Sequence, residues 1–256
     1  MPASLRLMSL AYFDTLSGIA GDMLLAALVD AGADVIYLEQ QLRSLPGLQN
    51  VRLLFSTTSR HGFRALRLDV QHPPEHVHRH LSDIEAMIVA SGLTDREREI
   101  SLRIFRRLGA AEAKVHGTTI EQVHFHEVGA IDSIVDIVGI AVALTQLQIT
   151  RIVASPTPTG SGTVTIAHGL VSVPAPATAE LLRGIPIRHS TVPAELTTPT
   201  GAAVLATLVD EFGALPSMQI SHIGCGAGHR ELSEQANVLR VLLGSEVAVE
   251  GTSPGA

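Results

Sequence analysis

Histidine is concentrated in one part of this sequence. Of the twelve histidines in the chain, seven fall between His72 and His126, and the densest group is His76, His78 and His80. Because residues at every second position of an extended segment face the same way, this spacing predicts three imidazoles that converge on one point. Imidazole nitrogen suits zinc, copper, iron and nickel. We therefore predict a transition-metal site here, although an exposed strand whose histidines bind nothing would show the same pattern.

A second group of candidate ligands follows at His124, His126 and Glu127. If this segment is extended, His124 and His126 share a face, and if it is helical, His124 and Glu127 do. Two metal ligands therefore converge under either conformation. The alternative is a helix end whose polar side chains lie in solvent. The segment lacks the His-Glu-x-x-His spacing of zincin metalloproteases.

Two carboxylates interrupt the most apolar stretch of the chain, residues 131–147. Asp132 and Asp136 lie four positions apart in a segment otherwise rich in Ile, Val and Ala. A membrane span of about 20 uncharged residues is therefore not available, and we predict a buried helix instead. Like charges on such a helix are costly unless each finds a partner or a cation. Capping of the helix explains Asp132, which leaves Asp136 as a candidate metal ligand.

Two glycine-bearing turns could bind a phosphate group. One spans residues 17–22 ahead of a predicted helix, and the other spans residues 160–162. Free amides at the start of a helix favour anions. Neither turn completes a Walker A loop or a Gly-x-Gly-x-x-Gly fingerprint, so each could also be an ordinary turn. A third glycine-rich turn holds Cys225, whose thiol is either a soft metal ligand or a small core residue.

Composition excludes several classes of protein. The chain has 256 residues, of which 46% are hydrophobic and 17% charged, as expected for a globular protein and not for a disordered or fibrous one. A formal net charge of -7 and an aromatic content of 3% without Trp argue against a nucleic-acid partner. A single cysteine excludes an internal disulfide and a Cys-rich metal site. We predict a cytoplasmic protein with no signal peptide and no membrane partner.

The elements that must position these side chains follow from local patterns. Alternation and apolar periodicity predict strands at residues 7–13, 51–55 and 66–70, a helix from the 17–22 turn through Val29, and a second helix over residues 34–45. Three capping boxes predict further helix starts, at Ser82/Glu85, Thr94/Glu97 and Thr118/Glu121. After residue 150, the patterns predict helices at 177–182 and 200–211 and strands at 218–223 and 238–242.

The fold class that follows is α+β (mixed α/β), a sheet packed with several helices. Residues 1–150 form an α/β part that carries the histidine clusters. Residues 151–245 form a β-rich part with two helices, which we expect to be one compact unit with the first. Residues 246–256 are expected to be a flexible tail.

Several motifs together resemble the LarC family, the nickel insertion proteins of the nickel-pincer cofactor. They are Phe13-Asp14, Ser17-Gly18-Ile19, Gly21-Asp22-Met23, the run at 76–81, the segment at 124–137, Gly160-Ser161-Gly162, His168-Gly169, and the segments at 173–177, 195–202 and 237–241. The resemblance covers nearly the whole chain and rests on many motifs in one order. Departures from the family pattern are Thr15, Ser172 and Cys225, so Cys225 is not expected to be a ligand.

The resemblance implies an enzyme, a lyase-type nickel insertase. It would insert Ni²⁺ into pyridinium-3,5-bisthiocarboxylic acid mononucleotide, the last step in making the cofactor of lactate racemase-type enzymes. Members of the family are longer and use CTP, with Mg²⁺ or Mn²⁺, through a C-terminal domain. This chain resembles the N-terminal part, so that domain is expected to be missing or separately encoded. Its expected partners are the mononucleotide, such a domain, the acceptor racemase and further copies of the chain in a homo-oligomer.

Roles within these motifs are assigned by the resemblance and by chemistry. The nickel ligands are expected to be His76, His78, His80, His124, His126 and Asp136. The groups that hold the mononucleotide are expected to be Asp14, Ser17, Gly18, Gly21, Asp22, Gly160 and Gly162. Forming a nickel–carbon bond requires loss of a ring proton, for which Glu127 is the expected base. A nickel store or metallochaperone and a metal-dependent hydrolase are the alternatives, and metal preference would separate them from an insertase.

Overall fold

A mixed sheet of seven strands organises the fold. The computed structural model describes residues 9–73, 79–125 and 130–247, and the strand order in the sheet is β11-β6-β1-β13-β12-β3-β2. The strands are β1 (Ser9–Asp14), β2 (Arg52–Arg60), β3 (Phe63–Gln71), β6 (Ile149–Ala154), β11 (Glu211–Phe212), β12 (Met218–Ala227) and β13 (Val238–Glu246). Strand β1 runs parallel to β6 and antiparallel to β13. Parts of the chain before and after residue 150 therefore share one sheet, and the predicted mixed α/β class is confirmed.

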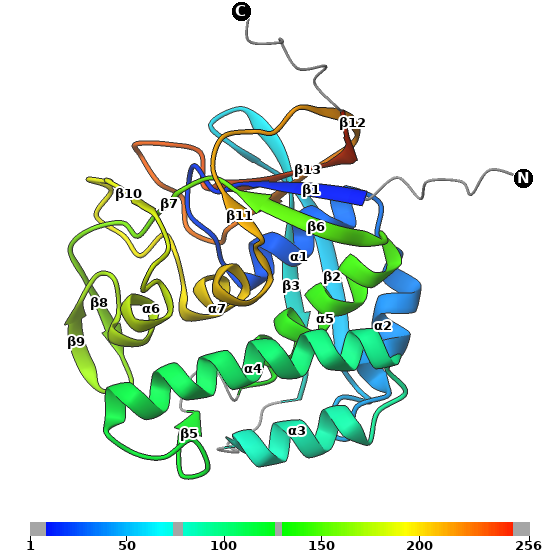
Figure 1. Ribbon diagram of the computed structural model, residues 1–256, viewed down its shortest axis with the longest axis vertical. Helices are drawn as coiled ribbons and strands as arrows, with labels where there is room; N and C mark the ends of the chain where they lie inside the picture. Colours follow the sequence, from blue (N-terminus) through cyan, green and yellow to red (C-terminus); the bar gives the residue numbers. More distant parts are fainter. Residues whose placement is uncertain (1–8, 74–78, 126–129, 248–256) are drawn as a thin grey trace, which may run out of the picture.

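The helices gather on one side of this sheet (Figure 1). They are α1 (Gly21–Asp30), α2 (Val35–Arg43), α3 (Leu81–Val89), α4 (Asp95–His116), α5 (Ile131–Gln146), α6 (Pro176–Leu181) and α7 (Pro199–Leu208). The long helix α4 lies across the others, with α3 beyond it (Figure 1). Leu24 and Leu25 of α1 and Ile137 and Ile140 of α5 are fully buried, because both helices are apolar nearly all round and form the centre of the core.

Helix α1 lies unusually close to the sheet. A Cβ atom at Gly224 would lie 1.9 Å from the carbonyl oxygen of Ala27, and one at Gly226 would lie 1.8 Å from that of Met23. Only glycine permits such an approach of two backbones. The glycine-rich end of β12 therefore fixes the position of α1, and with it the turn that precedes α1.

The predicted capping boxes differ in outcome. At Thr94, the backbone N–H donates to the Glu97 carboxylate at 2.7 Å and the hydroxyl accepts from the Glu97 N–H at 3.4 Å, as predicted. Helix α3 begins earlier than the Ser82 pattern predicts. Its N-cap is His80, whose N–H donates to Asp83 at 2.9 Å, because the chain enters the helix directly from a short strand.

The prediction of a helix that starts at Thr118 is wrong. Gly117 takes a left-handed conformation, with φ of 62°, and ends α4. The Thr118 hydroxyl then donates to Gln122 at 3.2 Å within a series of turns. The chain reaches strand β5 (His124–Phe125) within a few residues, which leaves no room for a helix. The other predicted helices and strands are present with ends shifted by a few residues, and the 131–147 segment forms the buried helix α5.

Three small ladders lie outside the main sheet. Strand β4 (Arg79–His80) pairs antiparallel with β5, β7 (Thr157–Pro158) pairs parallel with β10 (Ile187–Arg188), and β8 (Thr163–Ile166) forms a hairpin with β9 (Gly169–Ser172). Within the described residues, no helix has both the length and the apolar character needed to cross a bilayer.

Candidate functional site

The two histidine clusters of the sequence meet in the β4–β5 ladder. His80 lies opposite His124, and Arg79 lies opposite Phe125. Residues directly opposite each other in an antiparallel pair have Cα atoms about 4.5–5.5 Å apart. The ladder therefore joins one end of the 76–80 cluster to one end of the 124–127 cluster. His76, His78, His126 and Glu127 lie outside the described residues.

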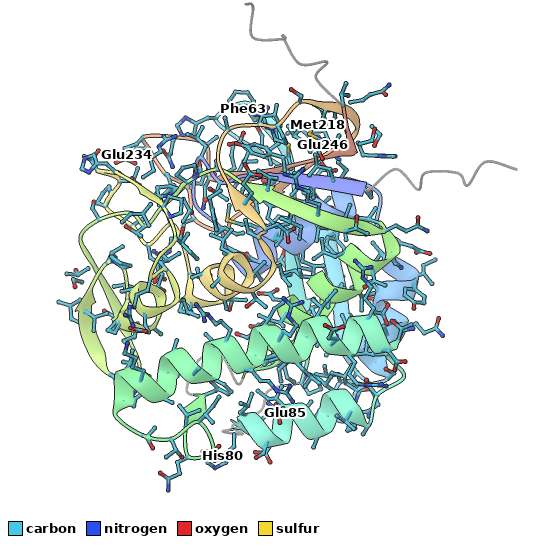
Figure 2. All side chains as sticks on the ribbon, viewed as in Figure 1. Phe63, His80, Glu85, Met218, Glu234 and Glu246 are labelled. Atoms are coloured by element: carbon cyan, nitrogen blue, oxygen red, sulfur yellow. The ribbon has the colours of Figure 1, made fainter. Side chains whose placement is uncertain are left out.

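One ring nitrogen of His80 has a partner in the backbone. Its Nδ1 atom lies 3.2 Å from the carbonyl oxygen of Val123, and because a carbonyl can only accept, Nδ1 is the donor of this hydrogen bond. Histidines that bind metals commonly donate their second ring N–H to a carbonyl in this way. His80 lies at the start of α3, at the opposite end of the molecule from Met218 and Glu246 (Figure 2).

Helix α4 packs against this ladder. Phe125 is 2% exposed and Leu81 is 6% exposed. A Cβ atom at Gly109 of α4 would lie 3.3–3.4 Å from side-chain atoms of Ile120, Leu81 and Phe125. The small residue on α4 thus lets the ladder and the start of α3 pack closely against the helix, which holds His80 in place.

Asp136 is the most unusual carboxyl group of the described residues. The residue is half-buried on α5, but its Oδ1 atom is fully buried and has no hydrogen-bond partner among the residues that the structure describes. The backbone N–H of Asp22 donates to this carboxylate. Burial, reinforced by the nearby carboxylates of Asp22 and Asp132, raises the pKa of Asp136 well above its usual range. A cation or a proton is what such a group requires.

Gly21 permits the contact between α1 and Asp136. A Cβ atom at Gly21 would lie 2.5 Å from Oδ2 of Asp136 and 2.8 Å from its Cγ. The N-terminal turn of α1 therefore already faces an internal carboxylate. Helix N-termini favour anions, and in this protein Asp136 occupies that position.

Other residues of the 17–22 turn form hydrogen bonds with backbone carbonyls of the protein. The N–H of Gly18 donates to Thr15 at 2.8 Å, the N–H of Ile19 donates to Leu196 at 3.0 Å, and the Ser17 hydroxyl donates to Ala236 at 2.6 Å. Just before the turn, Asp14 at the end of β1 pairs with Arg240 at 2.6 Å. These contacts order the turn, and binding of a mononucleotide by Asp14, Ser17, Gly18, Gly21 and Asp22 stays a prediction.

The second glycine turn lies beside the same segment of chain. Gly160 forms a β-bridge with Glu195, while Ile19 forms one with Thr197. A Cβ atom at Gly160 would lie 1.8 Å from the carbonyl oxygen of Ala194, whereas one at Gly162 would meet nothing within 4 Å. The segment at 192–201, which we call the bridging segment, thus brings together the two glycine turns that the sequence analysis treated separately.

A histidine that the sequence analysis did not single out joins two carboxylates near Asp136. Nδ1 of His229 lies 3.0 Å from Asp22, and its Nε2 lies 3.0 Å from Asp69. These hydrogen bonds, the one to Asp22 first, raise the pKa of His229 to about 9. One helical turn before Asp136 on α5, Asp132 lies 3.4 Å from His72. The position of His229 after a glycine-rich turn was visible in the sequence, but its partners lie on distant elements.

Comparison with known proteins places these features in a family. A family model described as "Nickel insertion protein" matches residues 11–254. The chain belongs to this nickel insertion family. Relatives named pyridinium-3,5-bisthiocarboxylic acid mononucleotide nickel insertion protein occur in Geobacillus kaustophilus, with 46% identity over 96% of this chain and 62% of the relative, and in Desulfitobacterium hafniense, with 50% identity over 93% and 58%. This chain thus spans about three fifths of the length of the relatives it matches. No solved structure matches it.

The described part of this nickel insertion family member does not by itself supply a metal centre. Among residues 9–73, 79–125 and 130–247, no group of three or more His, Cys, Asp or Glu side chains is arranged to hold a metal ion. Burial, with Asp30 nearby, raises the pKa of the Cys225 thiol, so this side chain is a poor thiolate ligand. The predicted nickel ligands at 76, 78 and 126 lie outside these ranges and stay predictions.

Proposed function

We propose that this chain handles nickel in the insertion of Ni²⁺ into pyridinium-3,5-bisthiocarboxylic acid mononucleotide. The observation that carries the proposal is the β4–β5 ladder, which sets His80 opposite His124 and so joins the two histidine clusters. The names of the relatives supply the reaction and its substrate. In this reading, both clusters contribute to one nickel site.

The donor set suits a metal that must be passed on. Nickel has to leave its site for a ligand with two sulfur atoms and a ring carbon, so imidazole and carboxylate donors serve better than thiolates, which hold the metal more firmly. His80 supports this role, because its Nδ1 atom lies 3.2 Å from the Val123 carbonyl oxygen, the kind of contact that orients metal-binding histidines. The further proposed ligands are His76, His78, His124, His126 and Asp136.

The chemical step needs a base as well as the metal. As nickel bonds to the ring carbon, the electron pair of the C–H bond becomes the carbon–nickel bond and the proton leaves to a base. We assign that base to Glu127, which directly follows the second histidine pair in the sequence. The glycine turns at 17–22 and 160–162 would hold the ribose and phosphate of the substrate, and the bridging segment lies beside both of them.

The length of the relatives bears on how the reaction is completed. This chain spans about three fifths of their length. We propose that the CTP-dependent part of the reaction, with Mg²⁺ or Mn²⁺, involves a C-terminal region of the family beyond the residues matched here, and that the loaded cofactor passes to a racemase. We place the reaction in the cytoplasm, where the single thiol at Cys225 stays reduced.

Nickel titration of the chelator-stripped protein by calorimetry tests the proposal. We expect tight binding by the wild type, and loss of the same site in a His76/His78/His80→Ala variant and in a His124/His126→Ala variant, because the ladder joins both clusters. A His222→Ala variant is the control, since His222 is exposed on β12. Retention of full nickel affinity by either cluster variant would refute the shared site.

The pH dependence of nickel binding gives a second test. Because imidazole binds metals only when neutral, nickel affinity should fall as the pH drops through about 6.5. Activation of the metal-free mononucleotide, with the C-terminal domain added, then separates an insertase from a nickel store. Preference for zinc or manganese with turnover of simple esters would instead indicate a hydrolase.

A further inference from the structure

A pocket outside the histidine ladder gathers four ionisable side chains. Glu112 and His116 come from the last two turns of α4, His168 comes from the turn between β8 and β9, and Glu195 comes from the bridging segment. The cavity has a volume of about 130 Å³. Its remaining walls are apolar and include Val171. We call this cavity the imidazole pocket.

Polar side chains of the imidazole pocket lie close to one another. The ring centroids of His116 and His168 lie 4.7 Å apart with the planes tilted by 50°. Glu112 lies one turn before His116 on the same face of α4, and its carboxylate is 3.5 Å from the His116 ring nitrogen. Apolar walls with a few convergent polar groups are typical of sites for small organic molecules.

Resting on the proposed function, we propose that the imidazole pocket binds the pyridinium ring of the mononucleotide substrate. Its volume of about 130 Å³ is close to the roughly 150 Å³ of a cavity that binds benzene, so its size is that of about one six-membered ring. A metal ion is a poorer occupant, since the histidine and glutamate side chains here are not among any group of described residues arranged to hold one. The pocket is therefore better suited to a flat ring than to a cation.

The charges in the pocket match the two kinds of charge on this substrate. Its ring nitrogen is cationic, and carboxylates such as Glu112 and Glu195 attract a cation. Its two thiocarboxylate groups are anionic acceptors, and the ring N–H groups of His116 and His168 are donors. An imidazole can also stack on the face of a flat aromatic ring. The pocket thus offers complementary contacts to a ligand that carries both signs of charge.

The imidazole pocket shares elements with the other parts of the proposed site. His116 lies roughly 10 Å along α4 from Gly109, where the β4–β5 ladder packs, at 1.5 Å per residue. Glu195 pairs with Gly160, and the neighbouring Leu196 packs on Gly18. The pocket is therefore linked through α4 to the histidine ladder and through the bridging segment to both glycine turns.

Binding of pyridinium-3-carboxylic acid mononucleotide to the full chain tests this inference. This probe keeps the ring, ribose and phosphate and replaces the two thiocarboxylates with one carboxylate. Calorimetry would compare the wild type with Val171→Phe, which fills the pocket, and with His168→Ala, which removes one donor. Leu170→Phe is the matched control, because Leu170 is 70% exposed on the same hairpin and does not line the pocket.

We expect Val171→Phe and His168→Ala to weaken probe binding at least tenfold, and Leu170→Phe to change it less than twofold. Thermal midpoints of all variants would show that they remain folded, and His168→Ala, which adds no bulk, keeps the test valid if Val171→Phe unfolds. Equal probe binding by His168→Ala and the wild type, or no probe binding by the wild type, would overturn the inference.

Nickel titration of the same variants separates this inference from the proposed function. If nickel binding is lost only in the cluster variants and the pocket variants bind the probe as tightly as the wild type does, the proposed function stands and the pocket assignment fails. If the probe binds in the pocket but the wild type binds no nickel, the pocket assignment stands and the nickel role of the ladder fails.

Discussion

Replacing Asp136 with asparagine should stabilise the metal-free protein, and increasingly so as the pH rises. One oxygen of Asp136 is buried and lacks a hydrogen-bond partner among the described residues, and Asp22 and Asp132 repel its charge. The side-chain amide of the Asp136→Asn variant can still accept from the Asp22 N–H, while it adds a donor and carries no charge. The variant therefore removes the cost of ionising a carboxyl group inside the core.

The magnitude follows from proton linkage. Because the folded-state pKa of Asp136 is raised, the folded state binds this proton more tightly than the unfolded state does. The wild type therefore loses stability as the pH rises from about 4, the usual pKa of an aspartate, to the folded-state pKa. The slope is about 1.4 kcal/mol per pH unit. The Asp136→Asn side chain has no proton to lose, so the difference in the free energy of unfolding should grow at this rate.

Urea unfolding of chelator-treated protein between pH 4.5 and 8 would measure this difference. Glu99→Gln is the control, because the Glu99 side chain is 69% exposed and the loss of its charge should change the free energy of unfolding by less than about 0.5 kcal/mol. A destabilised Asp136→Asn variant, or a stability difference that does not change with pH, would refute the reasoning. If Asp136 is also a nickel ligand, the more stable variant should bind nickel more weakly.

Three further predictions concern the segments around the site. Gly21→Ala should destabilise the protein by about 1–3 kcal/mol, because the added methyl group meets the buried carboxyl of α5; Gly213→Ala, with open space around it, should be near neutral in the same urea unfolding experiment. Gly160→Ala should cost more than Gly162→Ala in thermal unfolding. Both positions have φ above 80°, which costs an alanine about 1–2 kcal/mol, but only the first adds a collision with backbone, so equal costs would contradict the geometry. In the wild type, the raised pKa of His229 stabilises the fold below pH 6.5, and this contribution disappears as the pH passes about 9. The His229→Gln variant should therefore lose less of its free energy of unfolding between pH 6.5 and 9, by an amount that partial exposure of the ring reduces. An unchanged dependence of the free energy of unfolding on pH would argue against the ion pairs.

Local patterns predicted most of the secondary structure because they depend on neighbours in the sequence. The capping box at Thr94 and the apolar 131–147 segment are complete within a few turns of helix, and both formed as predicted. The pattern at Thr118 is equally complete, yet no helix forms there. The short span to β5 and its pairing with β4 decide that conformation, and neither is visible at Thr118.

The site was predictable in its parts and not in its arrangement. The alternating histidines and the lone Asp136 in an apolar helix are signals of residue type and spacing. Their partners are set by tertiary contacts, such as the approach of Asp22 through Gly21. His168 stood out only as part of a family motif and His116 not at all, because the contact between their rings joins two distant elements.

The place of β13 in the sheet affects how the protein is made. Strand β1 contacts it from Ser9 opposite Ser245 to Asp14 opposite Arg240, and β12 flanks its other side. A ribosome that adds about 5–20 residues per second needs on the order of 10–50 seconds between making these two strands. During that time the N–H and C=O groups on one edge of β1 have no antiparallel neighbour, and open strand edges promote aggregation. A growing chain of this protein is therefore expected to depend on chaperones until its central strand has emerged.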